Sequence, residues 1–460
     1  MNSKSFILLI CVVIGLLVFG AVSCSKRLNP FIPNSGSGNG GGENDPEWFL
    51  PPEEQIKPFM EQTIIFKSEA GPEEDAGGNP LPKKIYRIPG ITVSEKNTII
   101  AVADNRKGSY KDVGFTGSKN IDIVVRRSTD GGKNWGPEII IPPVATDNKN
   151  AHGDSLFFSC ANGDLVVLCA AGGGYKRDQG FGASKIMISR STDDGLTWSD
   201  WKDVQGDINN FNSGKLQGYD RGFAASGTGA RLNDSFGTLM GAMLVNNSSM
   251  KVQSAAAVIV STDNGYTWTV RSVAKRTQGT KEQDEPKVIT QLNDGRILLS
   301  VRSGNWETKV KKRVWFRSQA NLGSAWEEFT PKGNFFDGAC NAEGILFTST
   351  LDGYDKNRLI HLALDSESAT RQNLTAFISY DEGMSWEKQK VLNSGRAGYA
   401  ALARLKDGTI VTLSEEQGGQ ANLPNTKNEL YNIVFRRFNL RWLTDMKDYY
   451  TPPNQALRRR

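Results

Sequence analysis

One eight-residue pattern recurs along the chain and limits what it can fold into. Four segments fit Ser-x-Asp-x-Gly-x-x-Trp, and they begin at Ser128, Ser191, Ser261 and Ser379. A degraded copy in the last and longest gap keeps Ser318, Gly323 and Trp326. Counting that copy, the repeat has a period of about 60 residues. Such a period is typical of propellers and solenoids, whose core grows by repetition.

The residue types in this repeated turn explain why it recurs. Asp accepts hydrogen bonds from backbone N–H groups of a tight turn. Gly permits a positive φ, and we expect Trp to pack the turn against its own blade. Each copy follows a β-rich run, so we place it at the turn of a hairpin. We therefore assign these motifs to folding and not to chemistry.

Short β-rich runs fill the intervals between the turns. Runs at 98–102, 121–126 and 165–169 are separated by Gly, Asn and Asp. Glycine is abundant, at 48 residues, which favours tight turns over long helices. We therefore predict an all-β fold over 61–445. A length of about 385 residues, at about 60 to 65 per unit, predicts a six-bladed β-propeller.

The N-terminus has the features of an export signal. Lys4 precedes an apolar run over 6–22, and the run ends in Ala21-Val22-Ser23-Cys24. Small residues before a cysteine resemble a bacterial lipobox. We therefore expect 1–23 to be a lipoprotein-type signal peptide and Cys24 to carry the lipid. A plain signal peptide, or an N-terminal membrane anchor, is the alternative.

The remaining terminal segments are expected to lie outside the folded unit. Residues 24–60 are rich in Gly, Ser, Asn and Pro, so they predict a flexible tether. Residues 446–460 form a C-terminal tail that ends in three arginines. We expect an exported cell-envelope lipoprotein, facing the periplasm or the outside, with a secreted protein as the alternative. Any membrane contact is expected only through the lipid.

Charge, histidine and cysteine content exclude several functions. The net charge is +5, and no basic block with interleaved aromatic residues stands outside the arginine tail, so nucleic-acid binding is not expected. With only two histidines, His152 and His361, a histidine-based metal site or a Ser-His triad is not expected. We predict no cofactor and no metal. Cys160 and Cys169 flank one turn, and the sequence leaves open whether they form a disulfide.

The repeated turn resembles the Asp box of sialidases, which are six-bladed propellers. Asp boxes also occur in unrelated propellers, so this resemblance alone supports the fold more than the function. A sialidase holds a sugar whose anomeric carbon carries a carboxylate. Arginine suits that group, because it is permanently charged and can bind a carboxylate through two parallel hydrogen bonds.

Three arginines match the family's carboxylate-binding positions, each in its own motif. Arg87 lies in Tyr-Arg-Ile-Pro before the first box. Arg302 follows the strand expected at 297–301, whereas its competitor Arg296 begins that strand. Arg371 begins Arg-Gln-Asn-Leu-Thr before the fourth intact box. The resemblance implies that Arg87, Arg302 and Arg371 bind the substrate carboxylate together.

The nucleophile must approach a centre that already carries a carboxylate. A neutral phenol avoids charge repulsion if a base takes its proton, and sialidases use Tyr in this way. Tyr399, in Gly-Tyr-Ala-Ala-Leu, is the candidate, although the family often has Ser after the Tyr. Glu285, followed by Pro286, matches the family's base. Asp284 and Glu282 are close rivals for that role.

Three further residues complete the resemblance. Asp112, in Lys-Asp-Val-Gly, matches the aspartate that protonates the leaving oxygen, with Asp104 and Asp122 as rivals. Arg106 matches a residue that contacts the 4-hydroxyl of the sugar. Glu415 matches the glutamate that pairs with the first arginine, although Glu416 leaves the register open.

The resemblance implies a retaining exo-α-sialidase. Its substrates would be terminal α-linked sialic acids of glycoproteins, glycolipids and oligosaccharides, and the enzyme is expected to be a monomer. A trans-sialidase or intramolecular trans-sialidase is the enzymatic alternative. A non-catalytic propeller that binds sialic acid is the alternative of another class.

Overall fold

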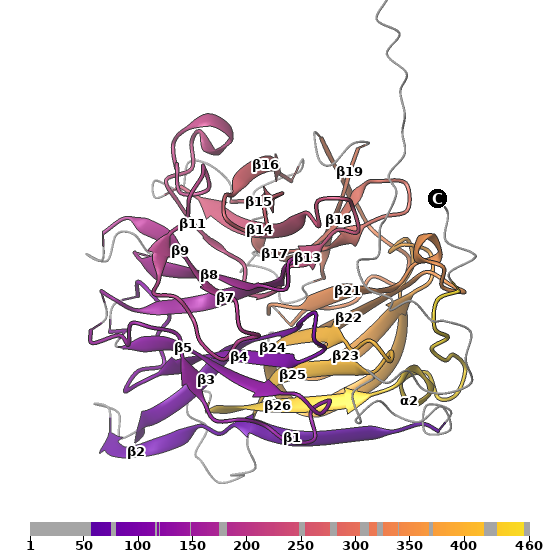
Figure 1. Cartoon of the computed structure of the whole chain (residues 1–460), viewed down its shortest axis with the longest axis horizontal. Coiled ribbons are helices and arrows are strands. Elements are labelled where there is room, and N and C mark those ends of the chain that lie inside the picture. The colour runs from indigo at the N-terminus through magenta and orange to yellow at the C-terminus, as the bar shows by residue number, and fades with distance from the viewer. Residues whose placement is uncertain are drawn as a thin grey trace, which may run out of the picture.

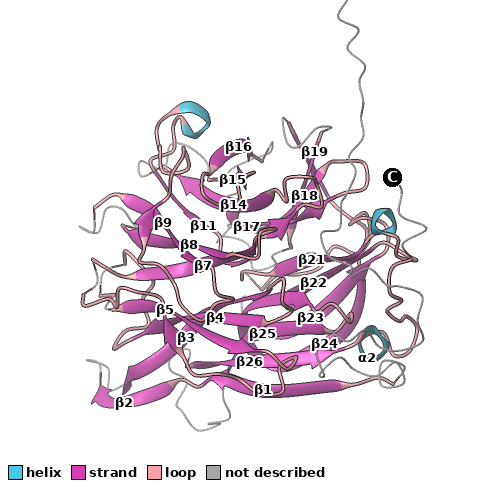
Figure 2. Cartoon of the chain, in the orientation of Figure 1, coloured by secondary structure: helices cyan, strands magenta, loops and turns pink. Residues whose placement is uncertain are grey.

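The computed structural model describes residues 57–454, apart from 75–79, 116, 119, 148, 174–181, 248–253, 277–282, 304–311, 320–324, 339, 368–370 and 418–429. The predicted signal peptide, Cys24 and most of the predicted tether lie outside the described residues. Strands dominate the described part (Figure 2). Its helical elements are one turn of α-helix and two of 3-10 helix: α2 (Leu440–Leu443), η2 (Gly214–Leu216) and η3 (Thr350–Asp352). No helix among the described residues is long and apolar enough to cross a membrane.

The strands form five sheets that stand around a common centre (Figure 1). The first sheet contains, in order, β2 (Glu69–Glu74), β3 (Pro80–Val93), β4 (Ile99–Arg106), β5 (Ile121–Ser128) and β6 (Ile139–Ile140). The second contains β10 (Lys202–Asp203), β9 (Ser184–Ser191), β8 (Leu165–Gly172), β7 (His152–Ser159) and β12 (Gly227–Thr228). The third contains β11 (Arg221–Ala224), β14 (Leu239–Asn246), β15 (Ala255–Ser261) and β16 (Thr269–Ala274), with β13 (Ala230–Arg231) also on β14.

The last two sheets complete the ring. The fourth contains β17 (Gln283–Gln291), β18 (Ile297–Ser303), β19 (Val314–Ser318) and β20 (Trp326–Phe329). The fifth has seven strands, which are β1 (Met60–Phe66), β26 (Tyr431–Phe438), β25 (Ile410–Gln417), β24 (Glu387–Arg404), β23 (Gln372–Ser379), β22 (Arg358–Leu364) and β21 (Glu343–Thr348). Neighbouring strands pair antiparallel throughout, except that β12 runs parallel to β7.

The all-β prediction is confirmed. The 18-residue strand β24 explains why five sheets are seen where six blades were expected. Its first half pairs with β23 and its second half with β25, so it belongs to two four-stranded groups. Dividing the seven-stranded sheet at β24 gives six groups. The innermost strands contact one another in turn around the centre, from β3 to β7 on one side and from β24 back to β3 on the other.

The repeated turns have the hydrogen bonds expected of them. In the first copy, Asp130 accepts from the backbone N–H of Asn134 at 2.9 Å and from the Ser128 hydroxyl at 2.8 Å. The fifth-position glycine has a positive φ in all four intact copies, at Gly132, Gly195, Gly265 and Gly383. The motif therefore closes a hairpin, as predicted from its residue types.

The tryptophan of the repeat was expected to pack against its own blade. Trp198 does meet Phe157 of its own sheet, with ring centroids 5.5 Å apart, but the prediction is wrong for the ring contacts of Trp135 and Trp268. Trp135 follows β5 but meets Phe435 of β26, with ring centroids 4.9 Å apart. Trp268 follows β15 but meets Phe158 of β7 at 4.9 Å. In these two copies the ring that the tryptophan meets belongs to the preceding blade. Each such tryptophan therefore joins two blades.

Gly132→Ala should destabilise the protein more than a matched control. At Gly132 φ is +92°, and an added Cβ would lie 2.4 Å from the Phe435 ring. At Gly163 φ is +89°, but nothing lies within 4 Å of an added Cβ. Gly163→Ala should cost about 1 kcal/mol from backbone strain alone, and Gly132→Ala about 1 to 3 kcal/mol more. Urea unfolding measures both, and equal losses would contradict the interblade contact.

Candidate active site

The structure brings all eight predicted site residues to one end of the ring. Arg87 lies in β3, Glu285 in β17 and Tyr399 in β24, which are inner strands. In antiparallel hairpins, one strand begins where the next one ends, so residues late in the second strand of a blade lie near residues early in the first. The same geometry brings the remaining five residues to this end of the ring. They are Arg106, Arg302 and Glu415 late in second strands, Arg371 just before β23, and Asp112 after β4.

A fully buried carboxylate, that of Glu415, connects two of the predicted positions. It accepts from Arg87 Nε at 2.8 Å and from Arg87 Nη2 at 3.2 Å. It also accepts from the backbone N–H of Ile88 at 2.7 Å and from that of Tyr399 at 3.0 Å. Glu415 therefore fixes the Arg87 guanidinium and the backbone that carries Tyr399 with one group.

The local sequence around Arg87 and Tyr399 makes room for this carboxylate. Ile88 has a φ of 55°, which is rare for a β-branched residue, and β3 is bulged between Arg87 and Gly90. The bulge turns the Ile88 N–H toward Glu415. Beside Tyr399, a Cβ added at Gly398 would lie 2.1 Å from Glu415 Oε2, so only glycine fits there. Strain of this kind persists where surrounding contacts over-determine it.

Tyr399 and Glu285 form a direct hydrogen bond in a buried place. The Tyr399 hydroxyl donates to Glu285 Oε1. Arg302 Nη1 donates to Glu285 Oε2 at 2.6 Å and lies 3.3 Å from Tyr399 Oη. The side chains of Glu285 and Arg302 are only 5% and 6% exposed, so water does not screen these contacts.

The pKa values of this pair are set in opposite directions. Burial, followed by the charge of Glu285, holds the pKa of Tyr399 well above its ordinary value. Burial alone would raise the pKa of Glu285, but the Arg302 charge and the hydrogen bonds from Tyr399 and Arg302 outweigh it and lower that pKa. The resting pair is therefore a neutral phenol beside an ionised carboxylate, which can accept its proton.

Arg371 completes a cluster of three guanidinium groups. Its guanidinium lies over the Tyr399 ring, 5.7 Å from the ring centroid. It interacts electrostatically with both Arg302 and Arg87. Glu415 and Glu285 compensate the charges of Arg87 and Arg302, and an anion placed among the three guanidinium groups would further offset their mutual repulsion. The cluster is therefore suited to a carboxylate ligand.

Asp112 and Arg106 form an ion pair at the margin of this cluster. Arg106 Nη1 lies 2.5 Å from Asp112 Oδ1, and Arg106 Nη2 lies 2.9 Å from Asp104 Oδ2. The Asp112 side chain is 47% exposed, whereas Arg106 is buried. Burial would raise the pKa of Asp112, but the charges of Arg106 and Arg87 outweigh it and lower that pKa. Asp112 is thus a solvent-accessible carboxylate beside the arginine cluster.

Comparison with known proteins shows which family the chain belongs to. A model of the BNR repeat-like domain matches residues 114–412. The chain belongs to this family. The match begins just after Asp112 and covers all four intact copies of the repeated turn as well as Glu285, Arg302, Arg371 and Tyr399.

Curated relatives of this BNR repeat-like chain are sialidases. The sialidase of Micromonospora viridifaciens is 28% identical over 81% of the chain, and that of Bacteroides fragilis is 25% identical over 72%. The chain spans 54% and 60% of the length of these two relatives. The resemblance to bacterial sialidases stated from the sequence is thereby confirmed.

Solved structures share the fold of this family member. The Hadza microbial sialidase Hz136 aligns with a TM-score of 0.60 at 22% identity, covering 77% of the chain and 65% of that structure. The intramolecular trans-sialidase from Ruminococcus gnavus aligns with a TM-score of 0.59 at 17% identity, covering 78% and 95%. Both likenesses extend to the propeller architecture.

The rivals named from the sequence have other partners in this BNR repeat-like fold. Arg296 donates to Asp294 at 2.6 Å at the opposite end of β18 from Arg302. Asp122 lies 2.7 Å from Lys107 Nζ. Glu416 binds Arg436 Nη2 at 2.9 Å, which separates it from Glu415. Asp284 remains beside the site, with its carboxylate 3.4 Å from Arg302 Nε.

Two rivals named from the sequence remain, Asp104 and Glu282, together with the cysteines. Asp104 binds the far side of Arg106 and not the arginine cluster. Glu282 lies outside the described residues. Cys160, Cys169 and Cys340 are all free and buried, which answers the question that the sequence left open about a disulfide.

Sequence reasoning missed Asp154, an acidic residue of this site. Its backbone N–H donates to Asp104 Oδ1 at 3.1 Å, and its φ is 56°. Burial and the charges of Asp104 and Asp112 raise the pKa of Asp154 well above its ordinary value. Burial also raises the pKa of Asp104, to about 6. The only available signal was Gly153, where a Cβ would lie 2.9 Å from Asp104, and one glycine is too common to single out.

His152, two residues before Asp154, predicts a pH dependence of stability. Burial of the ring, which stacks on Trp201, lowers its pKa from 6.5 to about 4 and outweighs the nearby charge of Asp122. Because the folded state disfavours the protonated imidazole, the contribution of His152 to stability is fully present above pH 6.5. This contribution is lost as the pH falls toward 4. Relative to His152→Gln, wild-type unfolding free energy should fall by about 3 kcal/mol over that range. Urea titrations at several pH values measure it, and parallel pH curves would contradict the assignment.

Proposed function

We propose that this protein is a retaining exo-α-sialidase. The observation that carries the proposal is the Tyr399–Glu285 hydrogen bond beside Arg302. This is a neutral nucleophile with its base, set next to three guanidinium groups. That combination matches an electrophilic carbon that itself carries a carboxylate, because an anionic nucleophile would be repelled there. Terminal sialic acids have this chemistry.

In the proposed mechanism, Arg87, Arg302 and Arg371 bind the substrate carboxylate. Asp112 donates its proton to the glycosidic oxygen as the bond to the anomeric carbon breaks. Tyr399 passes its proton to Glu285, and its oxygen forms a bond with the anomeric carbon. Asp112 then takes a proton from water, the water oxygen displaces Tyr399, and Glu285 returns the proton. Two displacements at one carbon retain its configuration.

Substrate binding should prepare Asp112 for this role. In the free protein, Arg106 and Arg87 hold the pKa of Asp112 low. A bound carboxylate neutralises part of the positive charge of Arg87 and Arg371, so it raises the pKa of Asp112 and favours the protonated acid. The proton donor is thus generated in the complex and not in the free protein.

Transfer to an acceptor sugar is the second candidate, because the same residues serve it. An acceptor alcohol would replace water in the second step. Incubation of the purified protein with defined α2-3, α2-6 and α2-8 sialosides, followed by mass analysis, separates the outcomes. We expect free sialic acid. Anhydro-sialic acid or a sialylated acceptor would identify transfer, and binding without turnover would identify a non-catalytic propeller.

We also propose that Cys24 is the lipid attachment site and that the protein resides in the cell envelope. Support comes from Ala21-Val22-Ser23-Cys24 after the apolar run. In cells grown with a labelled fatty acid, the wild-type protein should carry label and Cys24→Ser should not. Equal labelling would contradict the proposal, and an unlabelled wild-type protein in the medium would indicate a plain signal peptide.

A further inference from the structure

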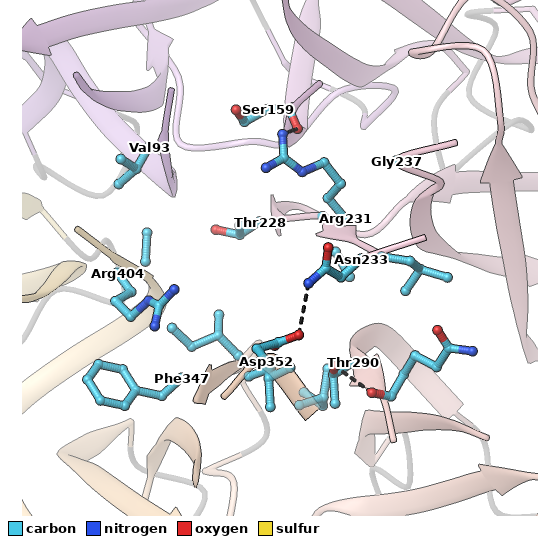
Figure 3. A pocket seen from close by; sticks show the side chains of 18 of the residues that line it. Val93, Ser159, Thr228, Arg231, Asn233, Gly237, Thr290, Phe347, Asp352 and Arg404 are labelled. Carbon is cyan, nitrogen blue, oxygen red and sulfur yellow. Dashed lines mark hydrogen bonds between the residues drawn. The ribbon is translucent and has the colours of Figure 1, made fainter. Parts of the chain in front are cut away.

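A second concave site lies at the opposite end of the same inner strands. It has a volume of about 540 Å³ and is lined by residues of several blades (Figure 3). β3 runs from Arg87 to Val93 of this cavity, and β24 runs from Tyr399 to Arg404. At about 3.3 Å per residue, the cavity is about 16 to 20 Å from the arginine cluster.

A buried ion pair separates this cavity from the arginine cluster. Lys287 lies between Glu285 and Ile289 on β17, and its Nζ is 3.6 Å from Glu343 Oε2. The Glu343 carboxylate also accepts from the backbone N–H of Thr228, which lines the cavity, at 2.8 Å. The exposed fractions of the Lys287 and Glu343 side chains are 2% and 0%. The cavity is therefore a distinct site and not an extension of the catalytic one.

Arg404 gives this cavity a cationic wall. Its guanidinium donates to the Tyr354 hydroxyl at 2.8 Å and lies over the rings of Phe347 and Tyr354, at 5.8 and 5.2 Å. Among the described residues, no carboxylate lies within salt-bridge distance of Arg404, and the charge of Asp352 acts on its guanidinium from farther away. Figure 3 shows the guanidinium directed into the cavity. A guanidinium has five N–H donors, so most remain available to an anion.

The facing wall offers hydrogen-bond acceptors. Asn233 Nδ2 donates to Asp352 Oδ1 at 2.8 Å, a contact drawn in Figure 3. Asn233 Oδ1 is buried and has no hydrogen-bond partner within the described part of the chain. A buried amide oxygen without a partner is costly, so this wall is suited to a ligand that donates hydrogen bonds. Arg231 on the same wall is already bound by Glu95.

We propose that this cavity binds a sugar acid. The carboxylate would pair with Arg404, and ligand hydroxyl groups would donate to Asn233 and Asp352. The cavity volume is within the range of small-molecule sites. A neutral sugar would leave the arginine with only its bond to Tyr354 and the more distant charge of Asp352, and an anion without hydroxyl groups would leave the amide oxygen without a partner. The proposal goes beyond sialidase activity and does not depend on it.

The test uses the Arg302→Ala protein, in which the arginine cluster of the catalytic site is broken. D-glucuronic acid, N-acetylneuraminic acid and the neutral sugar lactose are titrated by saturation-transfer NMR. Both acids should bind to Arg302→Ala and lactose should not. Adding Arg404→Gln should weaken binding of the acids about tenfold or more. Adding Arg296→Gln, which removes an arginine already paired with Asp294, should leave binding unchanged.

Three results would overturn the proposal. One is that neither acid binds to Arg302→Ala at about 10 mM. Another is that lactose binds as tightly as the acids. The third is that Arg404→Gln leaves binding unchanged. If Arg404→Gln does not fold, Asn233→Asp replaces it, because a second negative charge on that wall should also weaken binding of the acids. Sialoside turnover is not a readout, so failure of the proposed function would be seen separately.

Discussion

Turnover of a fluorogenic sialoside should fall by about a thousandfold or more when Tyr399 is replaced by Phe. The substitution removes the hydroxyl that donates to Glu285 but keeps the ring beneath Arg371. The expected loss is in kcat, because the three guanidinium groups proposed to bind the substrate carboxylate are unchanged. Initial-rate kinetics and binding of N-acetylneuraminic acid to the variant measure the two effects separately.

Tyr219→Phe is the matched control for this prediction. Tyr219 is likewise a buried tyrosine, and its hydroxyl has no hydrogen-bond partner among the described residues. Loss of that hydroxyl should leave turnover close to wild type. Near-wild-type activity of Tyr399→Phe would refute the nucleophile assignment. A comparable loss in both variants would point to a general effect of altering buried tyrosines.

Glu415→Gln should damage stability and substrate binding together. The carboxylate holds Arg87 and two backbone N–H groups, and its side chain is 0% exposed. Removing one partner of a buried ion pair leaves the other charge uncompensated, which costs about 3 to 5 kcal/mol. Arg87 also loses its orientation, so KM for a sialoside should rise. Urea unfolding and steady-state kinetics measure the two effects.

The neighbouring glutamate provides a control of the same chemistry. Glu416 is bound to Arg436, another largely buried pair. Glu416→Gln should therefore lower stability, whereas KM should stay near wild type. If both variants change KM equally, Glu415 has no specific role in positioning Arg87.

Sequence alone predicted features whose causes are local. The hydrogen bonds of the repeated turn lie within eight residues, so Ser128, Asp130 and Gly132 could be assigned without a structure. The candidate site residues could be proposed because each lies in a short motif that resembles a family pattern. The structure brings these motifs together, although they are far apart in the chain.

Features that depend on contacts between blades were not predictable. The partner of Trp135 is Phe435, about 300 residues away, and no local pattern points to it. The same holds for Asp154, whose environment is made by Asp104 and Asp112 of another blade. The pairing of β24 with both β23 and β25 was also not predictable, because the sequence of this 18-residue strand does not indicate where its partner changes.

The pairing of β1 with β26 has a consequence for how the protein is made. Met60–Phe66 is the earliest described strand, and its partner Tyr431–Phe438 is the last. During synthesis, the edge of β1 that pairs with β26 therefore stays unpaired until nearly the whole chain has emerged. This closure has a high contact order, so we expect it to be slow. Export before completion would carry β1 across the membrane unpaired, and final assembly would then take place outside the cytoplasm.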